Sequence, residues 1–188
     1  MNSETPAIKR KYNLSSLVLV GAMAAIMCLI SPIMVSLPVS PVPISLGTLA
    51  VTFAVTLLGT KKGVITVCIY ILLGLVGLPV YAGFMSGAGT LLGSTGGYII
   101  GYLPFAAIYG FCSAKGKHRL LPSLMGLLLG TLSCYVFGCL WLSFHHALTF
   151  SETIVVGVLP YIPGDAIKAI IALALGRQLR LRLGKVIS

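Results

Sequence analysis

The sequence predicts an all-α integral membrane protein: one transmembrane domain over residues 1–188, built as a bundle of six transmembrane helices. Hydrophobic residues make up 57% of the chain and charged residues only 9%, whereas soluble domains carry roughly 25% charged residues. Segments 12–60, 63–114 and 120–151 contain no charged residue at all. Each of these segments exceeds the ~20 residues that a helix needs to cross a bilayer, so lipid is the expected solvent.

Apolar runs bounded by charge, proline or glycine place the spans, in chain order, at about 14–37, 44–60, 63–78, 97–114, 120–144 and 154–176, the last restarting near 163. The first run is longer than the ~7–15 apolar residues of a signal peptide, so it is expected to be a retained span. The second and third runs are short for a hydrocarbon layer of ~30 Å. Lys61 and Lys62 are expected to extend to the membrane surface at their shared end, and the opposite ends leave room for a cavity.

The basic residues predict the orientation of the bundle. The chain has 13 lysine and arginine residues, and all except Lys168 fall on one side of the six-span arrangement. The positive-inside rule places that side, with both termini, in the cytoplasm, and segments 38–43, 79–96 and 145–152 outside. The expected location is the cell membrane, as a multi-pass protein in contact with lipid. Basic clusters in these positions indicate orientation and not nucleic-acid binding.

The outer segment from 79 to 98 is rich in glycine and carries no charge, which makes it too apolar for an ordinary solvated loop. Glycine lets the backbone approach a ligand closely, and irregular backbone at membrane depth is tolerated where it lines a cavity or is buried in protein. The alternative is a re-entrant loop that only packs against the helices. The candidate ligand-binding residues here are Tyr81, Gly83, Phe84, Ser94, Thr95, Gly96 and Tyr98.

Asp165 and Lys168 are the strongest candidates for a binding site. Pro160 and Pro163 interrupt the last apolar run, so a helix is expected to restart near Pro163 with Asp165 in its first turn. The spacing i, i+3 places Asp165 and Lys168 on one face of that helix. A charged pair inside a span usually faces an interior cavity and has a function. The alternative is a silent ion pair that complements the helix dipole.

Other chemistry has little support in the sequence. No Ser-His-Asp, Ser-Lys or H-E-x-x-H pattern and no phosphate-binding glycine loop appears, so an intramembrane enzyme is not expected and ATP hydrolysis would need another chain. The five cysteines lack metal-binding spacing, and the adjacent His145 and His146 are expected to be polar residues at a membrane boundary. In the first span, Gly21 and Ala25 form a small-xxx-small pair, suited equally to packing within the chain and to docking a partner helix.

Four stretches together resemble the BioY family of biotin-specific S components of energy-coupling factor (ECF) transporters. They are VPISLGTLAVTFAVTLLG (42–59), GLVGLPVYAG (74–83), LLGSTGGYIIGY (91–102) and LPYIPGDAIKA (159–169). The resemblance implies a six-helix subunit that captures biotin from outside with high affinity. It also implies delivery through a transmembrane coupling subunit and two ATPase subunits, with Gly21 and Ala25 in docking. Two positions depart from the family pattern, because Gly47 stands where glutamine is frequent and Ser94 where proline is frequent.

The residues are chemically compatible with biotin, which would be a transported ligand and not a cofactor. Asp165 can accept hydrogen bonds from the ureido N–H groups, and Lys168 can donate to the ureido oxygen. The opposite pose, in which Lys168 pairs with the carboxylate of biotin, stays open. A competing hypothesis is a self-sufficient secondary transporter of a small vitamin-like solute that uses Asp165 for proton coupling.

Overall fold

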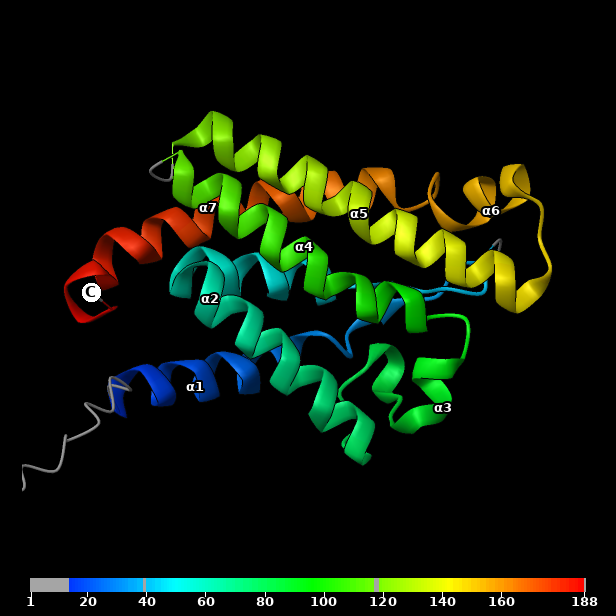
Figure 1. Cartoon of the computed structure of the whole chain (residues 1–188), viewed down its shortest axis with the longest axis horizontal. Coiled ribbons are helices and arrows are strands. Elements are labelled where there is room, and N and C mark those ends of the chain that lie inside the picture. Colours follow the sequence, from blue (N-terminus) through cyan, green and yellow to red (C-terminus); the bar gives the residue numbers. More distant parts are fainter. Residues whose placement is uncertain (1–13, 39, 117–118, 188) are drawn as a thin grey trace, which may run out of the picture.

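The computed structural model describes residues 14–38, 40–116 and 119–187. Five helices form the body of the molecule: α1 (Leu14–Ile30), α2 (Gly47–Val76), α4 (Gly96–Lys115), α5 (Leu120–His146) and α7 (Ile162–Ile187). Figure 1 shows them running side by side along the long axis. The shorter elements are β1 (Met34–Val35), β2 (Ile44–Ser45), η1 (Ala82–Phe84), α3 (Gly87–Leu92) and α6 (Phe150–Gly157).

Within the described residues, three helices are long and apolar enough to cross a membrane, namely α2, α4 and α5. The bent pair of α6 and α7 makes a fourth candidate, and α1 is a shorter apolar helix of 17 residues. The chain is therefore a helical, multi-pass membrane protein. By helix length and composition it has three or four candidate spans, fewer than the six predicted from the apolar runs.

α2 accounts for part of this difference because it is a helical hairpin. Gly59 interrupts it with φ 78° and ψ 176°, a conformation that is essentially restricted to glycine. A Cβ added to Gly63 would lie 2.9 Å from the Cα of Val55, although those residues would be about 12 Å apart along a straight helix. The chain thus folds back at Gly59 (Figure 1). The predicted spans 44–60 and 63–78 correspond to the two halves of α2.

α1 ends at Ile30, well before residue 37, the predicted end of the first span. Pro32 follows, and proline has no N–H with which to continue a helix. The chain then forms β1, which pairs antiparallel with β2 through Met34 and Ser45. The apolar residues after Ile30 therefore form a short hairpin, because hydropathy alone does not distinguish helical from extended apolar chain.

The last apolar run is broken, as its two prolines predict. α6 begins with a capping box in which Thr149 and Glu152 each accept from the other's backbone N–H. α7 begins at Ile162 after a break of 49° relative to α6. It extends to Ile187, beyond the predicted end at residue 176. The helix thus restarts near Pro163, as predicted.

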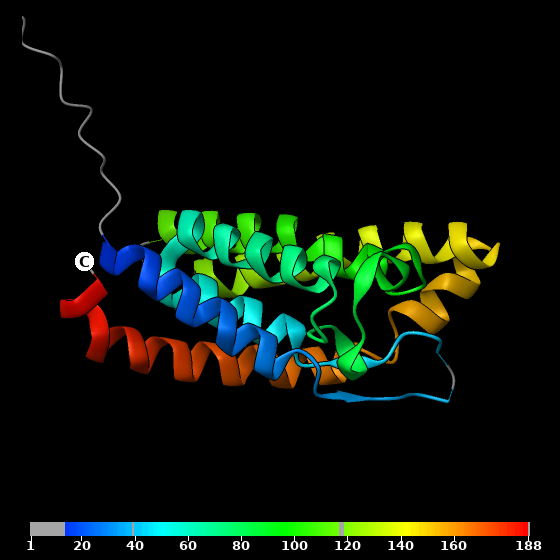
Figure 2. The same cartoon turned by 90° about the horizontal axis from the view of Figure 1, so that it is seen from below.

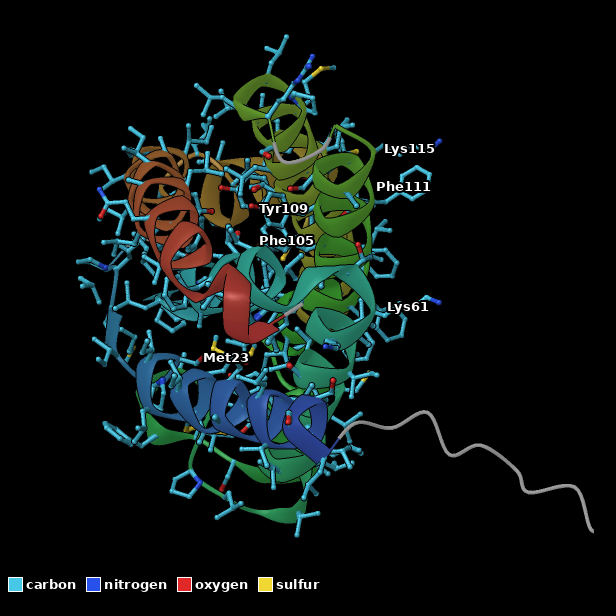
Figure 3. The ribbon with its side chains drawn as sticks, turned by 90° about the vertical axis from the view of Figure 1, so that its left-hand side faces the viewer. Met23, Lys61, Phe105, Tyr109, Phe111 and Lys115 are labelled. Atoms are coloured by element: carbon cyan, nitrogen blue, oxygen red, sulfur yellow. The ribbon has the colours of Figure 1, made fainter. Side chains whose placement is uncertain are left out.

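Small residues bring the helices into close contact around a continuous apolar core. Gly101 of α4 lies against Cys134 of α5, and a Cβ at that glycine would approach the Cα of Cys134 to 3.1 Å. Gly130 lies against Phe105 in the same interface. Phe105 and Tyr109 are almost fully buried, and Figure 3 shows both inside the bundle.

The start of α1 and the end of α7 lie at the same end of the molecule (Figure 2). The reversal in α2, the end of α4 and the start of α5 lie at that end too (Figure 1). Seen from there, Lys61 and Lys115 project outward, with the ammonium of Lys115 4.4 Å from the centroid of the Phe111 ring. The basic residues 9–11, also predicted for this side, lie outside the described residues. β1, β2, η1, α3 and α6 lie toward the opposite end (Figures 1 and 2).

Candidate functional site

An inner cavity of about 60 Å³ lies where α2, α4, α5 and α7 meet. Its lining is mostly polar and aromatic, and it includes the only ion pair found among the described residues, Asp165 with Lys168. The lining residues are Val42, Pro43, Ser45, Thr48, Tyr70, Ala82, Thr95, Tyr98, Ile99, Tyr102, Thr131, Cys134, Tyr135, Tyr161, Asp165 and Lys168.

The carboxylate of Asp165 joins three helices. It accepts a hydrogen bond from Lys168 Nζ at 2.9 Å, one turn along α7. It also accepts from the hydroxyl of Tyr135 on α5 at 2.6 Å and from that of Thr48 on α2 at 3.4 Å. A carboxylate offers about four acceptor sites, so this arrangement leaves capacity for one more donor.

Lys168 is the polar partner with unused capacity. Its side chain is only 10% exposed, and an ammonium carries three donors. One donor is used on Asp165, and the part of the chain that the structure describes supplies no acceptor for the others. Because a buried charge is costly without partners, Lys168 is suited to a ligand that brings an acceptor oxygen.

The break between α6 and α7 positions this pair. The backbone N–H of Asp165 donates to the carbonyl of Tyr161 at 2.8 Å, which holds Asp165 in the first turn of α7. Tyr161 is itself buried, and its hydroxyl donates to the carbonyl of Val42 and contacts Ser40 Oγ at 2.6 Å. The interrupted run thus fixes α7 to the chain just before β2.

A larger outer cavity of about 300 Å³ adjoins the inner one. The two share Pro43, Ala82 and Thr95, so they are contiguous. Met34 and Met85, which line the outer cavity, are exposed, and this cavity therefore opens at the molecular surface. Its full lining is Met34, Ser36, Leu37, Ser40, Pro41, Pro43, Ala82, Gly83, Met85, Thr90 and Thr95.

The structure brings four of the predicted site residues together in the inner cavity: Asp165, Lys168, Thr95 and Tyr98. Gly83 lines the outer cavity instead. Thr95 and Tyr98 come from the start of α4, and Tyr98 is held there by donating from its hydroxyl to the carbonyl of Gly157 at 2.8 Å.

The other predicted residues line neither cavity. Tyr81 is fully buried against Gly74 and donates to the carbonyl of Ile71 at 2.7 Å. Phe84 is 69% exposed. Gly96 packs so tightly against the backbone of Leu91 that a Cβ would lie 1.7 Å from the Leu91 carbonyl oxygen. Ser94 bonds to the ring nitrogen Nε2 of His146 at 2.7 Å.

Sequence reasoning missed the residues that surround Asp165 from other helices. Thr48 and Tyr135 are far from Asp165 in the chain, and each looks like an ordinary residue of an apolar run. Tyr102 is another cavity residue that was missed, and its hydroxyl lies 3.4 Å from Ser45 Oγ. A Cβ at Gly47 would approach that hydroxyl to 2.2 Å, so this glycine leaves the space that Tyr102 occupies. The departure of Gly47 from the family pattern was therefore the one sequence signal that could have indicated Tyr102 as a cavity residue.

The two small residues predicted for docking lie on the outside of the bundle. Gly21 and Ala25 are exposed on α1, and a Cβ at Gly21 would have no neighbour within 4 Å. The buried residues of α1 are Val20, Met23, Ala24 and Met27. Gly21 is therefore not used to pack α1 within the described chain.

Comparisons with known proteins agree on one family. The model of the BioY family matches residues 3–185. A probable biotin transporter BioY of Pyrococcus horikoshii is 39% identical over 146 residues, which cover 78% of this chain and 85% of that protein. The biotin transporter BioY2 of Lactococcus lactis is 32% identical over 166 residues, covering 88% of this chain and 90% of that one. Both relatives are named as transporters and not as enzymes.

A solved structure has the same fold. The crystal structure of the S-component for biotin from an ECF-type ABC transporter superposes with a TM-score of 0.84 and 32% sequence identity. The match covers 93% of this chain and 95% of that chain. Family model, sequence relatives and fold thus converge over nearly the whole length, and the chain belongs to the BioY family.

Proposed function

We propose that this protein is the biotin-binding S component of an ECF transporter, which captures biotin from outside the cell and delivers it inward together with an ATP-driven module. The observation that carries the proposal is the buried pair of Asp165 and Lys168 in an inner cavity that adjoins a larger cavity open at the surface. Relatives named as biotin transporters and the matching S-component supply the ligand and the kind of assembly.

The pair is complementary to the ureido group of biotin, which offers two N–H donors and one carbonyl acceptor. The unused acceptor capacity of Asp165 suits an N–H, and the unused donors of Lys168 suit the carbonyl oxygen. The inner cavity of about 60 Å³ is smaller than the ~300–1,000 Å³ of ordinary ligand pockets. Bound biotin therefore places its ring system in the inner cavity and its valeryl chain in the outer one.

The proposed orientation has both termini in the cytoplasm and six membrane-crossing segments, with the two halves of α2 counted separately. The reversal of α2, the end of α4, the start of α5, the start of α1 and the end of α7 share one end of the bundle (Figures 1 and 2). Each of these places lies next to a basic cluster in the sequence: 9–11, 61–62, 115–119 or 177–185. By the positive-inside rule, that end of the bundle is cytoplasmic. The two cavities then face the outside, where η1, α3 and the β-hairpin lie.

The exposed small residues of α1 are proposed to dock the transmembrane coupling subunit, with two ATPase subunits completing the module. Membrane helices approach closely where glycine and alanine replace larger side chains. Gly21 and Ala25 are available for such an approach because α1 packs against α2 through its other face.

The test is calorimetric titration of the purified chain with biotin, together with the variant Asp165→Asn. We expect the intact chain to bind biotin and the variant to bind about 10- to 100-fold more weakly, because a hydrogen bond to a charged group contributes ~1.5–3 kcal/mol. Glu152→Gln is the matched control, since Glu152 is an exposed carboxylate at the start of α6. Absence of biotin binding by the folded intact chain would overturn the proposal.

A second experiment separates the S component from the competing secondary transporter. The chain alone is reconstituted in liposomes with a proton gradient and without ATPase subunits. The proposal predicts no accumulation of labelled biotin under these conditions and accumulation once a complete ECF module and ATP are supplied. Uptake by the chain alone, driven by the gradient, would favour proton coupling through Asp165.

A further inference from the structure

The outer cavity differs from the inner one in having no charged side chain in its lining. Its polar groups are the hydroxyls of serine and threonine residues, together with backbone. No lysine or arginine lines this cavity; apart from Lys168, these residues belong to the sequence clusters at 9–11, 61–62, 115–119 and 177–185. The described lining of the outer cavity therefore offers a carboxylate no ion-pair partner.

The hydroxyl groups there are also already used. Thr90 donates to the carbonyl of Ser86 at 2.8 Å, and Thr95 donates to the carbonyl of Thr90 at 3.4 Å. Because the hydroxyl proton of Tyr161 goes to the carbonyl of Val42, Ser40 is the donor in its bond to Tyr161. Ser36 is exposed and contacts the sulfur of Met34 at 3.6 Å. Three of the four hydroxyl protons are thus committed to oxygen acceptors within the protein, and only exposed Ser36 can readily turn to a carboxylate, whose oxygens need donors.

The alternative partner for a carboxylate is Lys168, and the geometry disfavours it. Lys168 Nζ is 2.9 Å from Asp165 Oδ1 at the floor of the inner cavity. A ligand carboxylate brought to this ammonium would stand next to a second carboxylate in a desolvated site, where like charges repel. A neutral acceptor such as a ureido oxygen meets no such repulsion.

We propose that this site recognises the bicyclic ring of biotin and not its carboxyl end, so that it also takes biotin esters and amides, including Nε-biotinyl-lysine. The proposal rests on the proposed function, because it assumes biotin as the ligand. The outer cavity opens at the surface beside exposed Met34 and Met85, so a group attached to the carboxyl end extends outward without displacing a helix. The substrate class is then biotin substituted at its carboxyl group.

The test is displacement of labelled biotin from the full chain by three compounds. Biotin methyl ester has no tail carboxylate, and Nε-biotinyl-lysine replaces it with an amide, its α-carboxylate and α-ammonium lying several bonds further out. Biotin methylated on the ureido nitrogens alters the ring. We expect the ester and the amide to bind within tenfold of biotin, and the ureido-methylated compound to lose 100-fold or more. A loss of tenfold or more for both the ester and the amide overturns the proposal, as does unaltered binding of the ureido-methylated compound.

A gain-of-charge variant gives an independent readout. Ser36→Lys places an ammonium at the outer cavity, on a residue that is exposed and outside any helix. We expect this variant to prefer biotin over its methyl ester at least threefold more than the intact chain does, while Ser36→Gln keeps the original ratio. An unchanged ratio in Ser36→Lys overturns the placement of the tail. If biotin itself does not bind the intact chain, the proposed function is wrong as well. If biotin binds and only the ester and the amide bind tenfold or more weakly, this inference alone is wrong.

Discussion

Replacing Lys168 by methionine should destabilise the protein more than removing both charges of the pair. Methionine keeps the length and apolar body of the side chain but leaves Asp165 without its cation in a site where the two side chains are 10% and 14% exposed. Removal of one partner from a buried ion pair costs about 3–5 kcal/mol. Two donors to Asp165 remain, from Tyr135 and Thr48, so we expect a loss near the low end, about 3 kcal/mol.

The double variant Asp165→Asn with Lys168→Met removes the unpaired charge and keeps an oxygen that can accept from Tyr135. We expect it to recover at least half of the lost stability, because replacing a complete buried pair by neutral groups is often close to neutral. The assay is reversible unfolding in detergent for the single and double variants. Lys61→Met is the control; Lys61 is exposed, and surface substitutions usually change stability by less than ~0.5 kcal/mol. A double variant less stable than Lys168→Met would refute the reasoning.

Three further outcomes are expected. Gly59→Ala should lower stability by about 1–3 kcal/mol, measured by unfolding in detergent, because the φ of 78° at this position is unfavourable for alanine. The control Gly21→Ala lies inside α1 with nothing within 4 Å of the added Cβ, so it should not destabilise the protein and should stabilise it by up to about 1 kcal/mol. Equal stability of the two variants would contradict the strain at Gly59. Gly21→Leu should abolish co-purification with the coupling subunit and leave biotin binding intact; retained assembly would remove α1 from the docking surface. Trp141→Phe removes the indole N–H that donates to the Gly93 carbonyl at 2.9 Å. The loss of ~1 kcal/mol that holds the outer segment in place should speed biotin dissociation several-fold, measured in a chase experiment. An unaltered dissociation rate would show that this segment does not cover the ligand.

The helices that have charged residues at one end or both were the most predictable part of the fold. The predicted spans 97–114 and 120–144 agree closely with α4 and α5, because the basic cluster between them marks their shared end. The first run was less predictable: it reads as continuous apolar sequence, yet the chain leaves the helix after Ile30 and forms β1. Hydropathy reports the solvent around a segment and not its backbone conformation.

The candidate site shows a similar division. The spacing of Asp165 and Lys168 is local, so one helical turn brings them together as predicted. Tyr81 was predicted to bind the ligand because it is an aromatic residue in a glycine-rich segment. Its ring instead fills the space beside Gly74, and this contact depends on how the segment folds back on α2. Thr48 and Tyr135 reach Asp165 from other helices, and no local pattern marks such residues in advance.

If the proposed ligand binds at Asp165, the three donors on this carboxylate couple ligand binding to the arrangement of the helices. The carboxylate of Asp165 accepts hydrogen bonds from Thr48 of α2, Tyr135 of α5 and Lys168 of its own helix. A ligand that bonds to this carboxylate or to Lys168 would therefore change the hydrogen bonds that connect the three helices. Thermodynamic linkage makes such an effect reciprocal. A partner that changes the affinity for this ligand by shifting α2 or α5 relative to α7 then has its own affinity changed by the ligand by the same factor. Release of the ligand can therefore be driven from a surface that the ligand never touches.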